Sequence, residues 1–412
     1  MESEAARAAA RPSLPVSGIF ASGDFVRLWL LGLILFVVRW LEMLAMGVFV
    51  YEKTGSPFLV AMITMLRLAP MAFVGPFMGD LADRFERRTM LLVTVLTLFA
   101  GSSTLALLAL FGKLEVWHLA AATLVNGITW SSDNPVRRIL IGEVVRPEQV
   151  GRAMSIDIGT NNASRMIGPT IGGAVLAAIG MHGVFALSMA AYAMAFAIAL
   201  GIRHRAGIRG PMHGALLARI GHGITIARRE RRIVGALVIT VIFNVWGWPF
   251  TSMIPVIGQD RLLLDPGGIG LLASMDGLGA FVGASLIALF ARPPAYARLY
   301  LYGTALYLAA LPVFALVTHP VIAGAALLFT GITGSAFMTM QSTIVYMLAP
   351  PEIRSRIFGV LSMCIGLGPL GFVHLGLLAN WIGAPAATAC TGLEGVTVLA
   401  LTLPLWRPVL RA

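Results

Sequence analysis

The sequence is poor in charged residues. Only 12% of its 412 residues are Asp, Glu, Lys or Arg, about half the share found in a soluble domain. Hydrophobic residues make up 58% and the mean hydropathy is +0.85, so the chain has too little polar surface to face water on all sides. Much of its surface must therefore face lipid, and the sequence predicts a membrane protein. Its many glycines and prolines agree with this, since spanning helices tolerate both.

Cysteine is also scarce, and motifs for bound cofactors are missing. Cys364 and Cys390 lie inside apolar stretches, which argues against a disulfide framework or a zinc site. The sequence has no Gly-x-x-x-x-Gly-Lys loop to bind a nucleotide. The net charge of +11 does not indicate nucleic acid, because the charges fill short gaps between apolar runs. We therefore expect no metal, no cofactor and no nucleic-acid partner.

Long apolar runs divide the chain into candidate spanning helices, each needing about 20 mostly apolar residues. The N-terminus lacks a cationic segment followed by an apolar core, so residues 1–24 are predicted to be a cytoplasmic tail and not a cleaved signal. The fold class predicted is an all-α membrane protein of twelve transmembrane helices. The predicted spans cover residues 27–50, 57–79, 89–111, 116–140, 153–178, 181–202, 233–257, 267–291, 296–318, 321–348, 357–382 and 384–406.

Basic residues orient these spans, because Lys and Arg collect on the cytoplasmic side of a membrane. With the N-terminus inside, the predicted outer loops hold only Lys53, Lys113 and Arg261. Both termini are therefore predicted to be cytoplasmic, in a bacterial inner (plasma) membrane. A basic stretch divides the chain, and it either includes a short helix on the anionic inner leaflet or is a simple linker. The predicted domains are a six-helix bundle over 25–202, the linker over 203–232, a second six-helix bundle over 233–406 and a tail over 407–412.

Two short sequence matches indicate an internal repeat. The pattern Pro-Glu-x-x-x-Arg occurs at 147–152 and again at 351–356, and Ala-Phe-Val-Gly occurs at 72–75 and again at 280–283. The two offsets are nearly equal, and both matches fall at equivalent places of the two bundles. Pseudo-symmetric halves with a substrate site between them at the membrane midplane are a transporter architecture.

The gap after the second predicted span carries a motif. Residues 79–88 read Gly-Asp-Leu-Ala-Asp-Arg-Phe-Glu-Arg-Arg and resemble the loop signature of the major facilitator superfamily, Gly-x-Leu-Ala-Asp-Arg-x-Gly-Arg-Lys/Arg. The resemblance implies that Asp83 lies near the N-terminus of the eleventh helix, where the helix dipole favours a carboxylate. It also implies that an arginine of the motif meets an acid on helix four, for which Asp133 is available. The alternative is that these charges only enforce topology. The predicted gating residues are Gly79, Asp80, Asp83, Arg84, Arg87 and Arg88.

The fifth predicted span carries a second resemblance. Its sequence is similar to the antiporter signature of that superfamily, which ends in Gly-Pro-x-x-Gly-Gly and is associated with exporters. Small residues at such a seam let helices approach closely. The segments Thr-Gly-Ser-Pro at 54–57 and Arg-Leu-Ala-Pro at 67–70 resemble the multidrug and siderophore exporter branch, which includes enterobactin exporters. The residues that carry the antiporter-like seam are Gly159, Gly168, Pro169, Gly172 and Gly173.

Polar residues inside the predicted spans mark a candidate pathway. A charge at mid-helix costs about 2.5–3.5 kcal/mol on insertion scales, so such residues usually line the interior of a bundle. Glu42 and Asp133 each have an arginine within about one turn, Arg39 and Arg137, which is expected to keep the acid ionised. Neighbouring Met, Trp and Phe side chains suit an amphipathic substrate, or they are ordinary packing residues. The pathway candidates are Arg39, Glu42, Arg67, Asn126, Asp133, Arg137, Arg165, Asn244, Asp276 and Gln341.

Asp276 differs from the other acids because its own helix offers no basic neighbour. Burial favours the neutral form of such a carboxyl, as a proton carrier requires. In the superfamily that the chain resembles, helices five and eight pack together, which implies that Arg165 approaches Asp276. One hypothesis is that Asp276 alternates between a protonated form and a pair with Arg165. The other is a static structural pair.

These observations predict a monomeric secondary transporter that exports small amphipathic organic molecules, such as drugs or siderophores, in exchange for protons. A proton-coupled uptake symporter for a metabolite is the alternative within transport. A non-transporting membrane sensor or scaffold on the same fold is the alternative outside it. An enzyme is disfavoured, because no nucleophile, base and orienting group occur together and His374 and Glu394 are isolated. The predicted partners are the substrate, protons and the lipid bilayer.

Overall fold

The computed structural model describes residues 17–73, 85–204, 230–350 and 354–411. Every regular element in these ranges is a helix, and none of the described residues forms a strand. Nine helical segments of the described chain are long and apolar enough to cross a bilayer, which agrees with the predicted membrane protein. Outside the described residues lie most of the basic linker, the Pro-Glu pair of the second repeat, and four residues of the predicted gating loop, namely Gly79, Asp80, Asp83 and Arg84.

The first half of the chain begins with a capped helix and contains one sharp bend. The side chain of Ser22 accepts a hydrogen bond from the backbone N–H of Phe25, which starts α3, and Gly55 ends α3 in a left-handed conformation (φ +61°). Gly180 (φ +78°) bends α8 into two helices, at the boundary predicted between the fifth and sixth spans. The helices of this half are α2 (Ser17–Phe20), α3 (Gly23–Thr54), α4 (Pro57–Phe73), α6 (Arg87–Leu110), α7 (Val116–Val144), the short turn η1 (Pro147–Gln149) and α8 (Val150–Leu200).

The second half contains more and shorter helices. Its α12 starts after Asp265, whose carboxylate accepts hydrogen bonds from the backbone N–H groups of Gly267 and Gly268, with Pro266 at the first helical position. The helices are α10 (Arg231–Ile242), η2 (Phe243–Gly247), η3 (Trp248–Met253), α11 (Ile254–Asp260), α12 (Pro266–Phe290), η4 (Pro293–Ala295), α13 (Tyr296–Leu316), α14 (Pro320–Leu348), α15 (Arg354–Ile365), α16 (Gly368–Ile382), α17 (Ala384–Leu401), α18 (Leu403–Trp406) and η5 (Arg407–Arg411).

Two predicted spans of the second half are interrupted. The seventh, predicted as one helix over 233–257, changes to a π-helical turn in η2 and to a 3-10 helix in η3. Pro249 and Pro255, which cannot donate a backbone hydrogen bond, lie in or directly after this segment. The eleventh span, predicted over 357–382, breaks between α15 and α16. Hydropathy did not reveal either break, because a window of span length averages over these few residues, and Arg231–Asp260 and Ile357–Ile382 each remain apolar enough to cross a bilayer.

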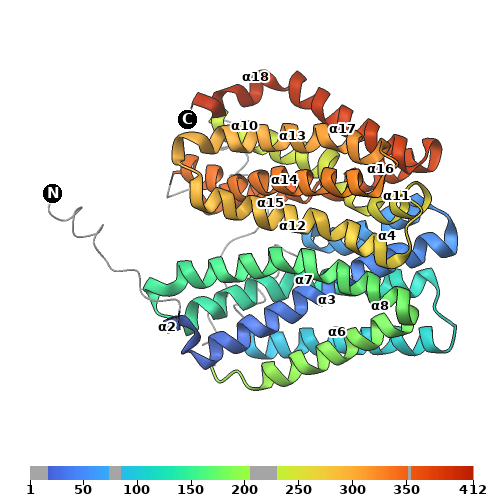
Figure 1. Ribbon diagram of the computed structural model, residues 1–412. Coiled ribbons are helices and arrows are strands. Elements are labelled where there is room, and N and C mark those ends of the chain that lie inside the picture. The colour runs from blue at the N-terminus through green and yellow to red at the C-terminus, as the bar shows by residue number, and fades with distance from the viewer. Residues whose placement is uncertain (1–16, 74–84, 205–229, 351–353, 412) are drawn as a thin grey trace.

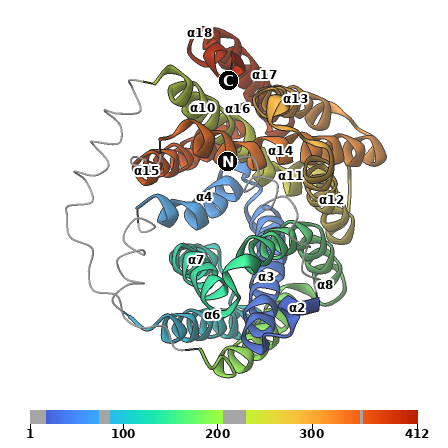
Figure 2. The same ribbon diagram turned by 90° about the vertical axis from the view of Figure 1, so that its left-hand side faces the viewer.

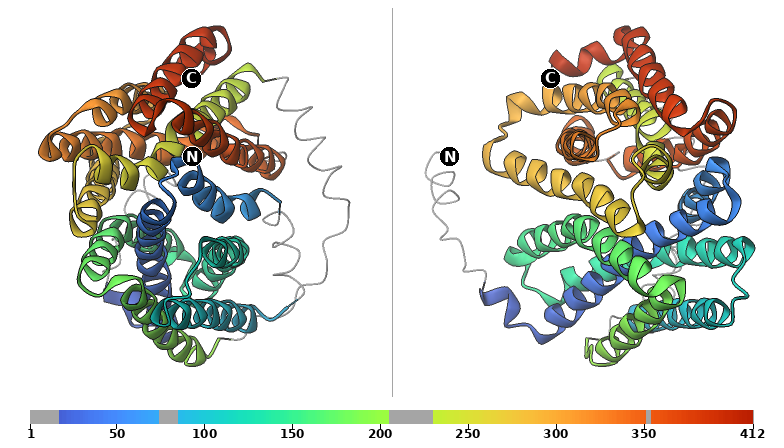
Figure 3. Two further views of the ribbon diagram at one scale, coloured as in Figure 1. Left: turned by 90° about the vertical axis from the view of Figure 1, so that its right-hand side faces the viewer. Right: turned by 45° about the vertical axis from the view of Figure 1, so that its right-hand side comes forward.

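The helices are arranged in two groups that follow the chain. Figure 1 shows α10 to α18 in the upper part of the view and α3, α6, α7 and α8 in the lower part, with α4 reaching across to the upper group. Both panels of Figure 3 keep this division. The first described helix, α2, and the C-terminal end of the chain lie at the same end of the molecule, which faces the viewer in Figure 2.

The buried apolar core joins the two halves at the opposite end. The larger core cluster contains Leu41, Met46 and Val50 of α3 together with second-half residues such as Ile257 and Leu375. A separate cluster holds the beginning of α3, from Phe25 to Val38, and contains only residues of the first half. We call the end of the molecule where α3 and α11 terminate the joined end. The two halves therefore share a core at the joined end but not around the start of α3.

Candidate functional site

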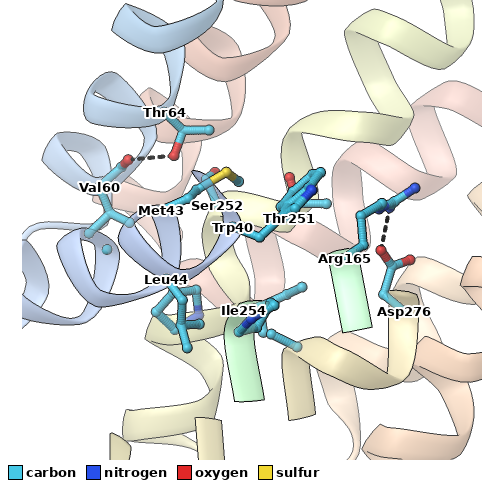
Figure 4. Close-up of a pocket in the computed structure, with 14 residues that line it drawn as sticks. Trp40, Met43, Leu44, Val60, Thr64, Arg165, Thr251, Ser252, Ile254 and Asp276 are labelled. Carbon is cyan, nitrogen blue, oxygen red and sulfur yellow. Dashed lines mark hydrogen bonds and ion pairs between the residues drawn. The ribbon is translucent and has the colours of Figure 1, made fainter. Parts of the chain in front are cut away.

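A cavity lies where the two halves meet. Its volume open to water-sized molecules is about 50 Å³, and it is lined by α3, α4 and α8 of the first half and by η3, α11 and α12 of the second. Figure 4 shows Arg165 and Asp276 pointing toward each other in this cavity. Its walls are mostly apolar or aromatic, with a few polar groups. The lining includes Trp40, Met43, Thr64, Arg165, Thr251 and Asp276.

Arg165 and Asp276 form an ion pair between the halves. The guanidinium Nη2 of Arg165 lies 2.5 Å from Oδ2 of Asp276, and the two side chains are 11% and 8% exposed. The guanidinium also lies 5.3 Å from the centre of the Trp40 ring and 3.6 Å from the sulfur of Met338. The expected approach of these two side chains is thus present, and both line the cavity.

Glycines bring α8 and α12 close enough for this pair to form. A Cβ atom on Gly277 would lie 2.4 Å from the carbonyl carbon of Arg165, and one on Gly173 would lie 2.8 Å from the Cα atom of Gly270. Such distances leave no room for a side chain. Pro169, four residues after Arg165, lines the cavity beside this crossing. Small residues are the usual means of close helix approach in membranes.

The same face of α8 also packs against α3. A Cβ on Gly168 would lie 2.8 Å from the carbonyl oxygen of Val37, and one on Gly172 would lie 2.7 Å from that of Leu41. The antiporter-like segment is therefore a crossing of three helices, α3, α8 and α12. Gly159 differs, since a Cβ there would meet no described atom within 4 Å. It is not part of the crossing.

The first half contains buried ion pairs whose partners differ from those predicted. Arg39 binds Asp133 across α3 and α7, with Nη2 3.2 Å from Oδ2, and stacks over Trp130 at 4.4 Å. It does not pair with Glu42 as its sequence position suggested. The carboxylate of Glu42 instead accepts a hydrogen bond of 2.8 Å from Ser102 of α6. The rotation of α3 directs the two side chains to different neighbouring helices.

Arg137 was expected beside Asp133, but its partner is Asp157 of α8. Both outer nitrogens of its guanidinium contact the two oxygens of Asp157, the bidentate geometry that arginine favours. The carboxylate also accepts from Nε of Arg138 at 3.3 Å. Gly32 makes room for this arrangement, because a Cβ there would lie 2.4 Å from Nη1 of Arg137.

The other predicted pathway residues are buried within one half and do not line the cavity. Arg67 donates to the carbonyl oxygen of Arg39 at 2.7 Å, and Asn244 donates to that of Thr240 at 2.9 Å. Asn126 lies inside the first half and Gln341 inside the second. In the ranges that the structure describes, the cavity thus gathers Arg165 and Asp276 from the predicted set, whereas the remaining members are buried away from it.

Two arginines of the predicted gating motif lie within the described residues. Arg87 meets an acid of α7 as the resemblance implied, but that acid is Glu143, 2.5 Å away, and not Asp133. Glu143 lies at the end of α7 beside the start of α6, whereas Asp133 is already bound to Arg39. Arg88 donates to the carbonyl oxygen of Leu200 at 2.9 Å.

Two contacts between helices were not predicted from the sequence. Tyr51 at the end of α3 donates a hydrogen bond to Asp260 at the end of α11, and this bond ties the halves together at the joined end. His374 and Glu394, isolated in the sequence, lie 2.7 Å apart on α16 and α17. No helical spacing could have found either pair, because each joins separate helices.

An all-helical protein with two halves around a cavity, and with most of its helices long and apolar, has the architecture of a membrane transporter. The chain belongs to the Major Facilitator Superfamily, whose sequence pattern matches residues 28–373. It is therefore a transporter of this superfamily rather than an enzyme.

Known proteins of similar sequence and structure agree. The chain is 21% identical to macrolide efflux protein A of Streptococcus pyogenes, over 81% of this chain and 83% of that protein. It is 24% identical to the uncharacterised transporter YfiS of Bacillus subtilis, over 88% of each. Among solved structures, a peptide transporter POT in complex with sulfate matches with a TM-score of 0.76 and 14% identity, over 97% of this chain and 99% of that one. At that identity the likeness concerns the fold.

Proposed function

We propose that this protein is a proton-driven exporter of small amphipathic organic molecules, such as drugs or siderophores. It works by alternating access, as a monomer with twelve spanning helices in two six-helix bundles. The observation that carries the proposal is the Arg165–Asp276 pair, which bridges the halves inside the cavity. Protonation of Asp276 releases Arg165, and loss of the proton restores the pair. One titration thus alters a contact between the two moving parts.

The cavity wall suits an amphipathic substrate. Trp40, Met43 and Val60 supply apolar and polarisable surface, while Thr64 and Thr251 supply hydroxyl groups. Met adapts to ligands of different shape, and pockets of this kind fix orientation with few polar groups. An ionised substrate would find its charged partner in the ion pair. A broad class of organic molecules fits such a wall better than one sugar or one inorganic ion.

The direction of opening follows from the basic residues. The joined end carries the loops with Lys53, Lys113 and Arg261, which the distribution of positive charge assigns to the outside. The structure then corresponds to a state closed outside, with both termini in the cytoplasm. Export requires the Tyr51–Asp260 bond to break. In the gating motif, Asp83 supports the opposite state by docking at the start of α15, while Arg87 anchors the motif to Glu143.

Relatives favour export, and a proton gradient supplies enough energy to drive it. One proton moving through 100 mV supplies about 2.3 kcal/mol, which sustains a substrate gradient of about fortyfold. The Streptococcus pyogenes relative is an efflux protein by name, and the antiporter-like residues Gly168, Pro169, Gly172 and Gly173 lie at the three-helix crossing. A second class, a membrane sensor without transport, gains support from none of these features.

Transport in proteoliposomes with an imposed pH gradient tests the function. The protein should move macrolides or siderophores against the direction of proton flow, and an ionophore that collapses the gradient should stop it. Liposomes without protein are the control. Accumulation in the direction of proton flow would instead identify an uptake symporter. No movement of any organic compound under either gradient would refute transport coupled to protons.

A further inference from the structure

A polar cluster lies in the second half, away from the cavity. Oε2 of Glu394 lies 2.7 Å from Nε2 of His374 and accepts a hydrogen bond of 3.1 Å from the indole N–H of Trp246. The side chains of His374 and Glu394 are 42% and 40% exposed. Among the described residues no hydrogen bond reaches the second carboxylate oxygen, Oε1. Glu394 is therefore held on one side and open on the other.

This cluster lies at an unusual depth. The stretch from Ala384, where α17 begins, to Glu394 rises about 15 Å, and the stretch from His374 to Ile382, where α16 ends, rises about 12 Å. Both ends border the joined end of the molecule. In a hydrocarbon core of about 30 Å, the carboxylate is near the midplane. A half-exposed acid at that depth is costly, and such residues usually serve a function.

An apolar groove of the second half meets this cluster at Trp246. Its volume is about 400 Å³, and it is lined by Val238 and Val241 of α10, Trp246 of η2, Cys364 of α15 and Val398 of α17. Glu394 does not line the groove but accepts the hydrogen bond of Trp246, which does. Glu394 and Val398 are one helical turn apart, so they share a face of α17. In Figure 2, α10 and α17 lie toward the margin of the second half that is remote from the first half.

We propose that the groove and Glu394 form a binding site for a lipophilic amine dissolved in the bilayer. The alkyl part lies along Val238, Val241 and Val398, and the ammonium group donates to the open oxygen Oε1 of Glu394. His374 and Trp246 hold the carboxylate through its other oxygen, so that it keeps one orientation. An anionic ligand is excluded by charge, and a neutral alkyl chain leaves the carboxylate without a partner.

Depth distinguishes this ligand from a phospholipid. A phospholipid headgroup stays at the membrane surface, about 15 Å from the midplane, and cannot bring its amine to Glu394. A small amphipathic amine partitions into the hydrocarbon core. Its ammonium group reaches the midplane only where a carboxylate such as that of Glu394 can pair with it. The site is separate from the cavity and does not depend on proton coupling at Asp276.

Binding of radiolabelled dodecylamine to the full-length protein in phosphatidylcholine nanodiscs tests the site, with dodecanol as the uncharged analogue. The wild type should prefer the amine to the alcohol. Glu394→Gln should lose about tenfold or more of the affinity for the amine and leave the alcohol unaffected, since a hydrogen bond between two charged groups is stronger than one to a neutral amide. Glu52→Gln, the same change at an exposed carboxyl, should bind as the wild type does.

A second variant keeps the test decisive if Glu394→Gln does not fold. Val398→Trp fills the groove without touching the carboxylate, and it should weaken the binding of both compounds. Equal affinity of the wild type for amine and alcohol would overturn the proposal, as would unchanged amine binding in folded Glu394→Gln or in Val398→Trp. If the wild type binds amine and alcohol equally well, the groove accepts any alkyl chain, and the polar cluster only joins α16 to α17.

Discussion

The two halves of this transporter are built from similar helices but have different interiors. The first half buries several charged side chains, and its arginines bind acids on neighbouring helices, as in Arg39–Asp133 and Arg137–Asp157. The second half is filled with aromatic rings. Phe243 stacks on Phe337 with ring centres 3.7 Å apart.

This difference singles out one residue. Among the described residues, Asp276 is the one buried charged side chain of the second half, and its partner Arg165 belongs to the first half. The buried charges of the first half find partners within that half, as Arg39, Arg137 and Glu42 do. Asp276 differs, because its partner belongs to the other half. The comparison shows that one fold can combine ion pairs within a half with a single pair between the halves, and our proposal assigns proton exchange to that single pair.

The largest expected effect concerns the static pairs. Asp157→Asn leaves the buried guanidinium of Arg137 without its carboxylate, which should lower the free energy of unfolding by about 3–5 kcal/mol. Denaturant unfolding in detergent measures this. The double variant Arg137→Met with Asp157→Leu should restore most of the loss, because a buried pair can often be replaced by apolar residues. A single variant as stable as the wild type would show that these charges do not hold the first half together.

A smaller effect is expected in the aromatic interior. Phe337→Leu keeps an apolar side chain but removes two ring contacts, with Phe243 at 3.7 Å and with Tyr300 at 5.3 Å. At about 0.5–1.5 kcal/mol for each aromatic pair, the same unfolding experiment should show a loss of about 1–3 kcal/mol. Phe329→Leu, on the exposed side of the same helix, should change little. Equal losses of unfolding free energy in the two variants would show that the stacked rings do not stabilise the second half.

The smallest effect concerns the contact at the joined end. Tyr51→Phe removes the hydrogen bond to Asp260, worth about 0.5–1.5 kcal/mol, and should raise the population open at that end by about two- to tenfold. Distances between spin labels placed on the ends of α3 and α11 report this shift. Tyr302→Phe, an exposed tyrosine, is the matched control. A shift toward the closed form, or none, would mean that the bond does not favour the closed state.

Sequence-based prediction was accurate for features that depend on a single helix, such as where the helix begins or ends. The predicted gaps between spans at 50/57, 178/181 and 257/267 contain Gly55, Gly180 and Pro266, where the structure ends, bends or begins a helix, because the backbone preferences of glycine and proline are local. The approach of Arg165 to Asp276 was also expected, since family resemblance indicated which helices pack together.

Prediction failed where a residue had a choice of neighbours. Helical spacing placed Arg137 beside Asp133, whereas the partner is Asp157 on the next helix. Spacing describes which residues share a face of one helix, but the rotation and crossing of helices decide which faces meet. For the same reason His374 and Glu394 seemed isolated in the sequence although they are in contact.

The proposed exchange of Asp276 between Arg165 and a proton is tested most directly by Asp276→Asn, which removes the carboxylate but keeps its shape. In proteoliposomes, transport driven by a pH gradient should be lost in this variant, whereas exchange of labelled for unlabelled substrate without a gradient should persist. Asp276→Glu, which keeps the carboxyl, should retain coupling. Transport by Asp276→Asn that still responds to the pH gradient as the wild type does would contradict the account.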